Sequence, residues 1–193
     1  MSKKLQPVVF LQGKRVYLRP IDASDLGRCE RWINDPEIRP FIRMQFPTDA
    51  MAQKKWHEGR DRGHPRRDIL LAIVLRKNDR HIGNMGLHGI DWINRSAITG
   101  ALIGEKDCWS RGYGREAKEL LLTYAFDTLG LHRISSDVRA NNPRSFAYLK
   151  KSGYVEEGRE RESVFYNGKW VDLIKLGILV EEWRALHHQE TRR

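Results

Sequence analysis

A glycine-containing loop at residues 109–114, Trp-Ser-Arg-Gly-Tyr-Gly, constrains the fold of this chain more than any other feature. It lies between a predicted strand and the clearest predicted helix. The apolar face of that helix recurs at helical spacing in Ala117, Leu120, Leu121, Tyr124, Ala125 and Thr128. In such a unit the first helical amides point at one spot, where the helix dipole adds partial positive charge, and glycines let the backbone approach a ligand. The loop therefore predicts an anion site.

Two nucleotide-binding loops contain similar glycines, and neither fits the sequence. A Walker loop ends in Gly-Lys-Ser or Gly-Lys-Thr, and neither tripeptide occurs in the chain. A Rossmann fingerprint needs three spaced glycines early in a doubly wound sheet, whereas this loop lies past mid-chain, after antiparallel strands. Two spaced glycines before a helix also occur in plain tight turns, so the loop taken alone leaves both interpretations open.

The pattern of apolar residues predicts an α/β chain. Strands are expected at residues 16–19, 69–75, 80–89, 94–104, 132–138, 163–166 and 169–180. Helices are expected at residues 22–34, from 48 or 49 to about 60, over 117–128 with an end at Gly130, and at 143–152. Three strands in succession before the loop predict an antiparallel meander, and Asn167-Gly168 predicts a hairpin turn between the last two.

The composition is that of one globular domain. The 193 residues are 40% hydrophobic and 31% charged, and no apolar stretch approaches the ~20 residues that cross a bilayer. The two cysteines, Cys29 and Cys108, make no disulfide framework, so a cytoplasmic protein without a membrane partner is expected. The net charge of +10 favours phosphate-bearing ligands. Because the charge is scattered, a nucleic-acid partner is not indicated.

Residues 103–117, Ile-Gly-Glu-Lys-Asp-Cys-Trp-Ser-Arg-Gly-Tyr-Gly-Arg-Glu-Ala, resemble the cofactor signature of GCN5-related N-acetyltransferases. The resemblance is closest to their RimJ/RimL branch, in which tryptophan often stands at the first loop position, as Trp109 does here. Further blocks agree in order and spacing at residues 131–134, 142–145, 151–154, 157–158 and 166–172. The later half is also similar to bacterial spermidine acetyltransferases.

The resemblance implies a single acetyltransferase domain at residues 13–183, with an N-terminal extension at 1–12 and a charged tail at 184–193. It implies a mixed, mostly antiparallel sheet of about six to seven strands flanked by about four helices. The strand before the loop and the strand after the helix should splay apart at the cofactor site. The long apolar hairpin at residues 165–180 favours a homodimer or a higher homo-oligomer.

The same resemblance implies acetyl-CoA as the donor, a primary amine as the acceptor, and no metal ion. The acceptor would be a small molecule or a protein N-terminus. Backbone groups before the loop would bind the pantetheine arm, and the loop amides would bind the pyrophosphate. The implied cofactor-binding residues are Leu102, Ile103, Gly104, Ser110, Arg111, Gly112, Tyr113, Gly114, Arg115, Asn142 and Ser145.

Two positions that are catalytic in many relatives carry other residues here. The strand before the loop often has a glutamate, where this chain has Ile-Thr at 98–99. A tyrosine often stands seven residues after the position of Asn142, where this chain has Leu149. The expected general acid is therefore Ser145, with Tyr148 as the alternative.

No general base stands out from the sequence, and the candidates are His88 and Asp91. Two other classes of function stay open. The chain could be a non-catalytic acyl-CoA-binding regulatory module, which would explain the missing glutamate and the displaced tyrosine. It could also be a basic RNA- or ribosome-associated protein that uses the same scaffold. Amine-dependent thiol release from acetyl-CoA separates the enzyme from the module, and salt-sensitive RNA binding would support the scaffold.

Overall fold

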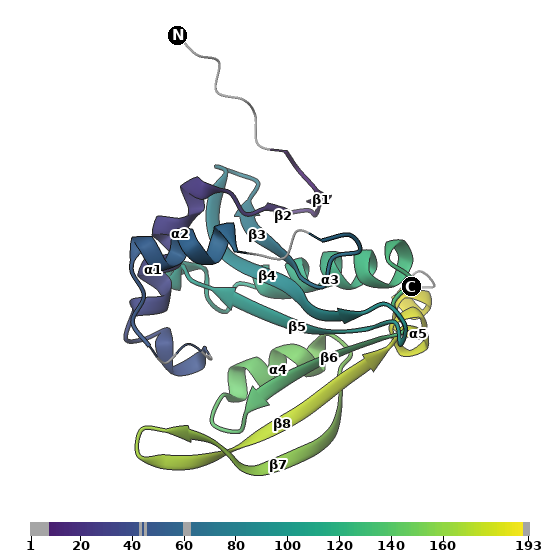
Figure 1. Ribbon diagram of the computed structural model, residues 1–193. Helices are drawn as coiled ribbons and strands as arrows, with labels where there is room; N and C mark the ends of the chain where they lie inside the picture. Colours follow the sequence, from purple (N-terminus) through teal and green to yellow (C-terminus); the bar gives the residue numbers. More distant parts are fainter. Residues whose placement is uncertain (1–7, 43, 45, 60–62, 191–193) are drawn as a thin grey trace.

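The computed structural model describes residues 8–42, 44, 46–59 and 63–190, which form one eight-stranded sheet with helices on both faces (Figure 1). The strands are β1 (Leu11–Gln12), β2 (Val16–Pro20), β3 (Ile69–Leu75), β4 (Arg80–Asp91), β5 (Ser96–Ile103), β6 (Arg133–Arg139), β7 (Val155–Tyr166) and β8 (Lys169–Leu179). The α-helices are α1 (Leu26–Asn34), α2 (Ala50–Glu58), α3 (Tyr113–Thr123), α4 (Pro143–Lys151) and α5 (Val180–Glu190). The strand order across the sheet is β1-β2-β3-β4-β5-β6-β8-β7.

Neighbouring strands pair antiparallel except β5 and β6, which are parallel. The predicted mixed, mostly antiparallel sheet is therefore confirmed, as is the meander of β3, β4 and β5. The described residues form eight strands rather than six or seven, because β1 also pairs with β2. They form five α-helices rather than four, because α5 follows β8. A two-residue strand is too short to show any alternation in the sequence.

The sheet opens between β5 and β6. The two strands pair at only three positions, from Ser96 opposite Arg133 to Ile98 opposite Ser135. Just past these pairs, side-chain hydrogen bonds take the place of backbone hydrogen bonds between the two strands. Thr99 Oγ1 donates to the Ser135 carbonyl (3.3 Å), and Ser136 Oγ donates to the Thr99 carbonyl (3.2 Å). Beyond these bonds the two strands no longer pair, which agrees with the splay that the resemblance implied.

Helices cover the two faces of the sheet separately (Figure 1). The main core joins α3 and α4 to alternate strand residues, including Met85 of β4 and Ile103 at the end of β5. A smaller apolar cluster joins α1, through Cys29 and Trp32, to Leu102. Because Leu102 and Ile103 are adjacent on one strand, these two clusters lie on opposite faces. The cofactor loop therefore lies on the α3 face and α1 on the other.

Helix α3 buries a wider stripe than the sequence pattern predicted. Ala117 and Leu121 are buried as expected, as is Ala125 just after the helix, whereas Thr128 is exposed. Lys118 and Leu122 are buried as well. A five-residue π-helical turn at Tyr124–Thr128 follows α3 and carries the chain towards β6. Lysine is among the residues least often found in a core, so hydrophobic periodicity did not identify Lys118.

The hairpin begins earlier than predicted, because β7 starts at Val155 rather than at residue 163. Its charged first part lies at the sheet edge with both faces exposed, so its sequence shows no apolar alternation. The hairpin projects past the body of the sheet at the lower left of Figure 1. Residues 184–190 of the expected tail belong to α5, whereas residues 1–7 and 191–193 of the expected extension and tail lie outside the described residues.

Candidate functional site

A cavity of about 530 Å³ lies where β5 leaves β6, below the N-terminus of α3 and beside α4. Most of the residues predicted from the sequence line it, namely Leu102, Ile103, Ser110, Gly112, Tyr113, Gly114, Arg115, Asn142 and Ser145. Tyr148 lines it as well. The structure thus brings together residues from three segments that the sequence had linked only by resemblance.

The loop into α3 has the backbone of an anion site. Gly112 is the N-cap and has a φ of +80°, in the left-handed region that favours glycine. Ser110 also has a positive φ, of +59°. The next amides, starting at Tyr113, have no intrahelical carbonyl to bind, because the helix starts there. A Cβ on Gly114 would lie 3.6 Å from Ile103 and 3.9 Å from Tyr148, so this position faces the space between β5 and α4.

Arg15, in the turn before β2, contacts the loop but was not among the site residues predicted from the sequence. Its Nη1 donates to the Arg111 carbonyl (3.0 Å), and its Nε lies 2.8 Å from Glu116 Oε2. The guanidinium is also 5.0 Å from the centre of the Tyr113 ring. Burial alone would raise the pKa of Glu116, but hydrogen bonds from the Arg15 backbone and side chain lower it. Only the tertiary contact across a hundred residues places this cation beside the loop.

The predicted cofactor-binding residues Leu102, Ile103 and Gly104 do not all turn their backbone groups to the same side of β5. The Gly104 amide donates to the Ile82 carbonyl (2.9 Å), so this residue bonds to the β4 side. In an antiparallel ladder the bonding direction alternates, so Leu102 also bonds towards β4, and Ala101 and Ile103 face the split. The Ile103 carbonyl already accepts a hydrogen bond from Trp109 Nε1 (2.7 Å), which leaves the Ile103 amide for a ligand. Ala101 lines the cavity. Register therefore points to Ala101 and Ile103, rather than Leu102 and Gly104, as backbone partners for a ligand.

Helix α4 presents both candidate acids to the cavity. Asn142 caps the helix by accepting a hydrogen bond from the Ser145 amide (3.1 Å), and it lines the cavity too. The Tyr148 hydroxyl is buried and has no hydrogen-bond partner among the described residues. Burial raises the pKa of Tyr148 well above that of free tyrosine, so the hydroxyl keeps its proton at neutral pH. Leu149, at the position where relatives often have tyrosine, is buried in the core.

The two candidate bases lie away from this cavity. On β4 they pair with Ile98 and Ser96, at the end of β5 where the strands are still joined. His88 Nδ1 is 3.5 Å from Asp68 Oδ1. Asp91 closes the turn after β4, and hydrogen bonds from Asn94 lower its pKa.

The segment after α1 forms one wall of the cavity through Ile38, Phe41 and Ile42. Arg139 at the end of β6 holds this segment by donating to the carbonyls of Pro40 (2.7 Å) and Ile42 (3.0 Å). The Arg144 guanidinium lies 4.3 Å from the Trp109 ring and 5.6 Å from the Phe41 ring. The wall and the cofactor loop are thereby joined across the cavity.

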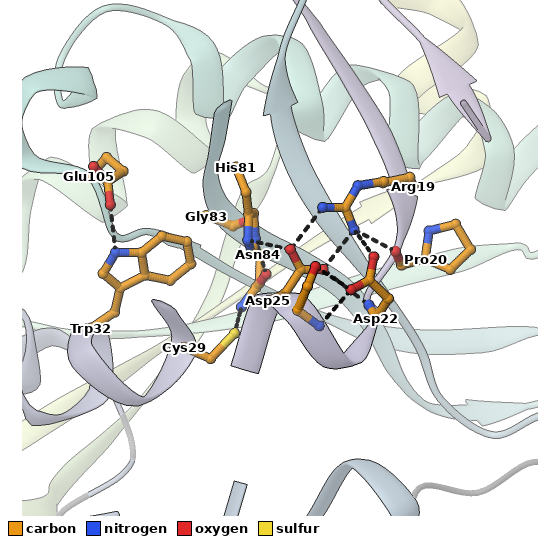
Figure 2. Close-up of polar contacts among 11 residues, drawn as sticks. Arg19, Pro20, Asp22, Asp25, Cys29, Trp32, His81, Gly83, Asn84 and Glu105 are labelled. Carbon is orange, nitrogen blue, oxygen red and sulfur yellow. Dashed lines mark hydrogen bonds and ion pairs between the residues drawn. The ribbon is translucent and has the colours of Figure 1, made fainter. Parts of the chain in front are cut away.

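A buried polar network fixes α1 against β4 (Figure 2). Arg19 donates two hydrogen bonds to Asp25 (2.6 and 2.8 Å), and both Asp25 and His81 are fully buried. His81 Nδ1 is 3.0 Å from Asp25 Oδ1, a close polar contact outside hydrogen-bond geometry, and its Nε2 faces the Gly83 carbonyl (2.9 Å). Asn84 completes the network by donating to Cys29 Sγ (3.2 Å).

Trp32 connects this polar network to the end of β5. Its ring meets the edge of His81 at 4.8 Å between centres, and its Nε1 donates to Glu105 (3.0 Å). A Cβ on Gly104 would lie 2.0 Å from the Trp32 ring, so only glycine fits there. Gly104 therefore serves the packing of α1 rather than the cavity.

Replacing Asp25 with asparagine should lower the free energy of unfolding by about 3–5 kcal/mol at pH 7, because Arg19 would lose its buried carboxylate. Burial would raise the pKa of Asp25, but the hydrogen bonds from Arg19 and the close contact with His81 outweigh it and lower that pKa. The stabilisation is therefore present above the ordinary pKa near ~4 and is lost as pH falls below it. Urea unfolding at pH 7 and pH 3 measures both effects.

The exposed pair Lys54–Glu58 supplies the control for this prediction. Glu58→Gln should change stability by less than about 0.5 kcal/mol at either pH, because a surface ion pair contributes little. Equal losses in Asp25→Asn and Glu58→Gln would contradict the role given to the network.

Comparison with solved structures identifies the fold. The crystal structure of spermidine N-acetyltransferase from Vibrio cholerae in complex with CoA and spermine superposes with a TM-score of 0.81, covering 89% of this chain and 99% of that one. The sequence identity is 23%, so the likeness shows the fold.

Sequence comparison then identifies the family. The family model of the acetyltransferase (GNAT) domain matches residues 15–155, and the chain belongs to this family of N-acetyltransferases. It is 32% identical over 180 residues to the probable N-acetyltransferase YjcK of Bacillus subtilis (strain 168), covering 88% of this chain and 97% of that protein. It is 32% identical over 102 residues to the spermidine N(1)-acetyltransferase of Vibrio cholerae, covering 53% of this chain and 58% of that one.

Among residues 8–42, 44, 46–59 and 63–190, no group of three or more His, Cys, Asp or Glu side chains could hold a metal ion. No helix in the described part of the chain is long and apolar enough to span a membrane.

Proposed function

We propose that this enzyme transfers the acetyl group of acetyl-CoA to a primary amine. The observation that supports this most is the cavity itself, which runs along the β5–β6 split and ends on the N-terminus of α3. An extended pantetheine arm fits beside a strand that has lost its neighbour, and a pyrophosphate fits unpaired helical amides. A site that accepted only a phosphate would not need the open strand.

In this arrangement the backbone groups of Ala101 and the amide of Ile103 bind the pantetheine arm, while the Ile103 carbonyl stays bonded to Trp109. The amides of Tyr113, Gly114 and Arg115 bind the pyrophosphate at the start of α3. Arg15, already held beside the loop by Glu116, adds positive charge. The basic net charge of +10 helps to attract the anionic cofactor.

The reaction needs positioning and one proton donor. The amine nitrogen attacks the thioester carbon, a backbone amide of the split polarises the carbonyl, and the C–S bond breaks as the thiolate gains a proton. We assign that proton to Tyr148, because its hydroxyl is buried in the cavity wall, protonated and without a protein partner. Ser145, three residues earlier on α4, is the alternative donor.

The acceptor is proposed to be a small molecule or a protein N-terminus that carries a primary amine. The spermidine N(1)-acetyltransferase among the relatives supports an amine acceptor. Release of free thiol from acetyl-CoA should appear only when a suitable amine is present. A panel of polyamines, aminoglycosides, amino sugars and peptide N-termini identifies the class of acceptor.

The same assay separates the rival classes of function. Tight acetyl-CoA binding without thiol release for any amine would favour a regulatory module. RNA binding that weakens steeply with salt, without turnover, would favour a scaffold for RNA or the ribosome. Either result would contradict the proposed transferase.

We also propose a cytoplasmic homodimer or higher homo-oligomer assembled through the β7–β8 hairpin. Phe165 and Trp170 are 57% and 60% exposed on this hairpin, and their ring centres lie 5.2 Å apart. Exposed aromatic pairs of this kind favour a protein contact. Sedimentation equilibrium over a range of protein concentrations tests the assembly.

A further inference from the structure

A lysine lies in the core beneath the proposed site. Lys118, on the inner face of α3, is only 1% exposed. Its Nζ lies 5.8 Å from the centre of the Tyr148 ring and 5.5 Å from the centre of the Tyr154 ring. Burial lowers the pKa of Lys118 to about 7, and no carboxylate among the residues that the structure describes counteracts this effect.

This lysine weakens the fold at neutral pH. An ammonium taken out of water without a carboxylate is costly, and an apolar side chain of similar length would fill the same space without that cost. The neighbouring inward positions on α3, Ala117, Leu121 and Leu122, are all apolar. The amine therefore needs an explanation other than stability.

The two tyrosines beside Lys118 are not equivalent. The Tyr154 hydroxyl lies 3.0 Å from Thr99 Oγ1, and because Thr99 already donates to the Ser135 carbonyl, Tyr154 is the donor in this bond. Tyr148, in contrast, lines the cavity and its hydroxyl has no protein partner. The cation thus lies next to one satisfied phenol and one whose buried hydroxyl has no hydrogen-bond partner among the described residues.

We propose that Lys118 is a positioning residue for the reaction, because its ammonium stabilises the phenolate that forms when Tyr148 protonates the departing CoA thiolate. This rests on the proposed function, with Tyr148 as the acid. The Tyr148 O–H bond breaks, an S–H bond forms on CoA, and the amine nitrogen loses one proton on forming the amide. That proton returns to the phenolate through solvent, so the cycle ends with the amide and the free thiol.

The expected size of the effect follows from Coulomb's law. If the 5.8 Å between Lys118 Nζ and the centre of the Tyr148 ring is taken as the separation of the charges, an effective dielectric constant of about 20 gives a rate effect of at most roughly 100-fold. The cation–π contact in the ground state is weaker, so most of this stabilisation appears only when the phenolate forms.

The pH dependence has a definite sign. The titratable groups that face Lys118 are Tyr148 on α4 and Tyr154 just before β7. Burial raises the pKa of both tyrosines, and that of Tyr148 lies well above the ordinary tyrosine value, so both stay protonated near neutrality. The ammonium form of Lys118 is the active one and is lost as pH rises through about 7. The kcat profile should therefore decline on the alkaline side.

The test compares Lys118→Met with Lys150→Met, which removes an exposed lysine from α4, in thiol release and in direct acetyl-CoA binding. Lys118→Met should lower kcat roughly 10- to 100-fold, remove the alkaline decline and leave the acetyl-CoA Kd within about twofold. Lys118→Arg should retain part of the rate, because it keeps the charge. Lys150→Met should behave as the wild type.

Unchanged kcat and an unchanged pH profile in a folded Lys118→Met protein, with active wild type, would overturn this inference and leave the proposed function standing. Absence of thiol release from the wild type with every amine would overturn both. A gain in the thermal midpoint of Lys118→Met, without a kinetic change, would show that the lysine has no part in the reaction.

Discussion

Replacing Gly114 with valine is expected to raise the acetyl-CoA dissociation constant roughly 1,000-fold, because the new side chain would enter the cavity where the pyrophosphate binds. The Gly114 Cβ position faces Ile103 and Tyr148 at ordinary contact distances of 3.6–3.9 Å, so the backbone tolerates the substitution. The methyl groups beyond it would block two or more charged hydrogen bonds from the first amides of α3. Isothermal titration with acetyl-CoA measures the change.

Gly158 on β7 supplies a matched control, because a Cβ there would meet nothing within 4 Å. Gly158→Val should bind acetyl-CoA as tightly as the wild type. Gly112→Ala is a separate case, since its φ of +80° would strain any side chain and a Cβ would lie 3.1 Å from Arg15. Wild-type affinity in Gly114→Val would remove the start of α3 from the cofactor site.

Replacing Tyr148 with phenylalanine is expected to lower kcat roughly 100- to 1,000-fold, because the thiolate would leave without its proton donor. The ring stays, so the packing against Gly114 and Lys118 is kept. Its hydroxyl has no protein partner among the described residues, so its loss should not destabilise the fold. Single-turnover thiol release and acetyl-CoA binding separate the chemical step from affinity.

Ser145→Ala is the matched comparison, because it removes the other hydroxyl that α4 presents to the cavity. Its backbone amide still donates to Asn142, so the helix cap remains. The kcat of Ser145→Ala should stay within about threefold of the wild type if Tyr148 is the acid. The reverse pattern, with a large loss in Ser145→Ala and little in Tyr148→Phe, would return the acid to Ser145.

The structure also reorders the candidate residues within the site. His88 and Asp91 were the candidate bases, yet they lie by the joined end of β5 and β6. Gly104, expected to contact the cofactor, instead makes room for Trp32. The proposed reaction therefore depends on the loop, on Tyr148 and on backbone groups of the split, and the base stays unassigned.

The sequence by itself determined the elements that depend on local pattern. The apolar runs of β3 and β5, the Asn167-Gly168 turn and the loop before α3 each carry their own signal within a dozen residues. The loop that most constrained the fold also lies at the predicted place, with Gly112 in the left-handed conformation. These features depend on backbone preferences and hydrophobic spacing, which act over short distances.

Only the tertiary structure decided which side chains meet. Arg15 reaches the loop across 96 residues of sequence, and the strand register turns Ala101 rather than Leu102 towards the split. Lys118 lies beside Tyr148 because α3 and α4 pack on the same face of the sheet. Such contacts arise from the packing of distant segments, and no local pattern of residues encodes them. The loop at 109–114 thus predicted where an anion should bind, whereas the fold determined which residues surround it.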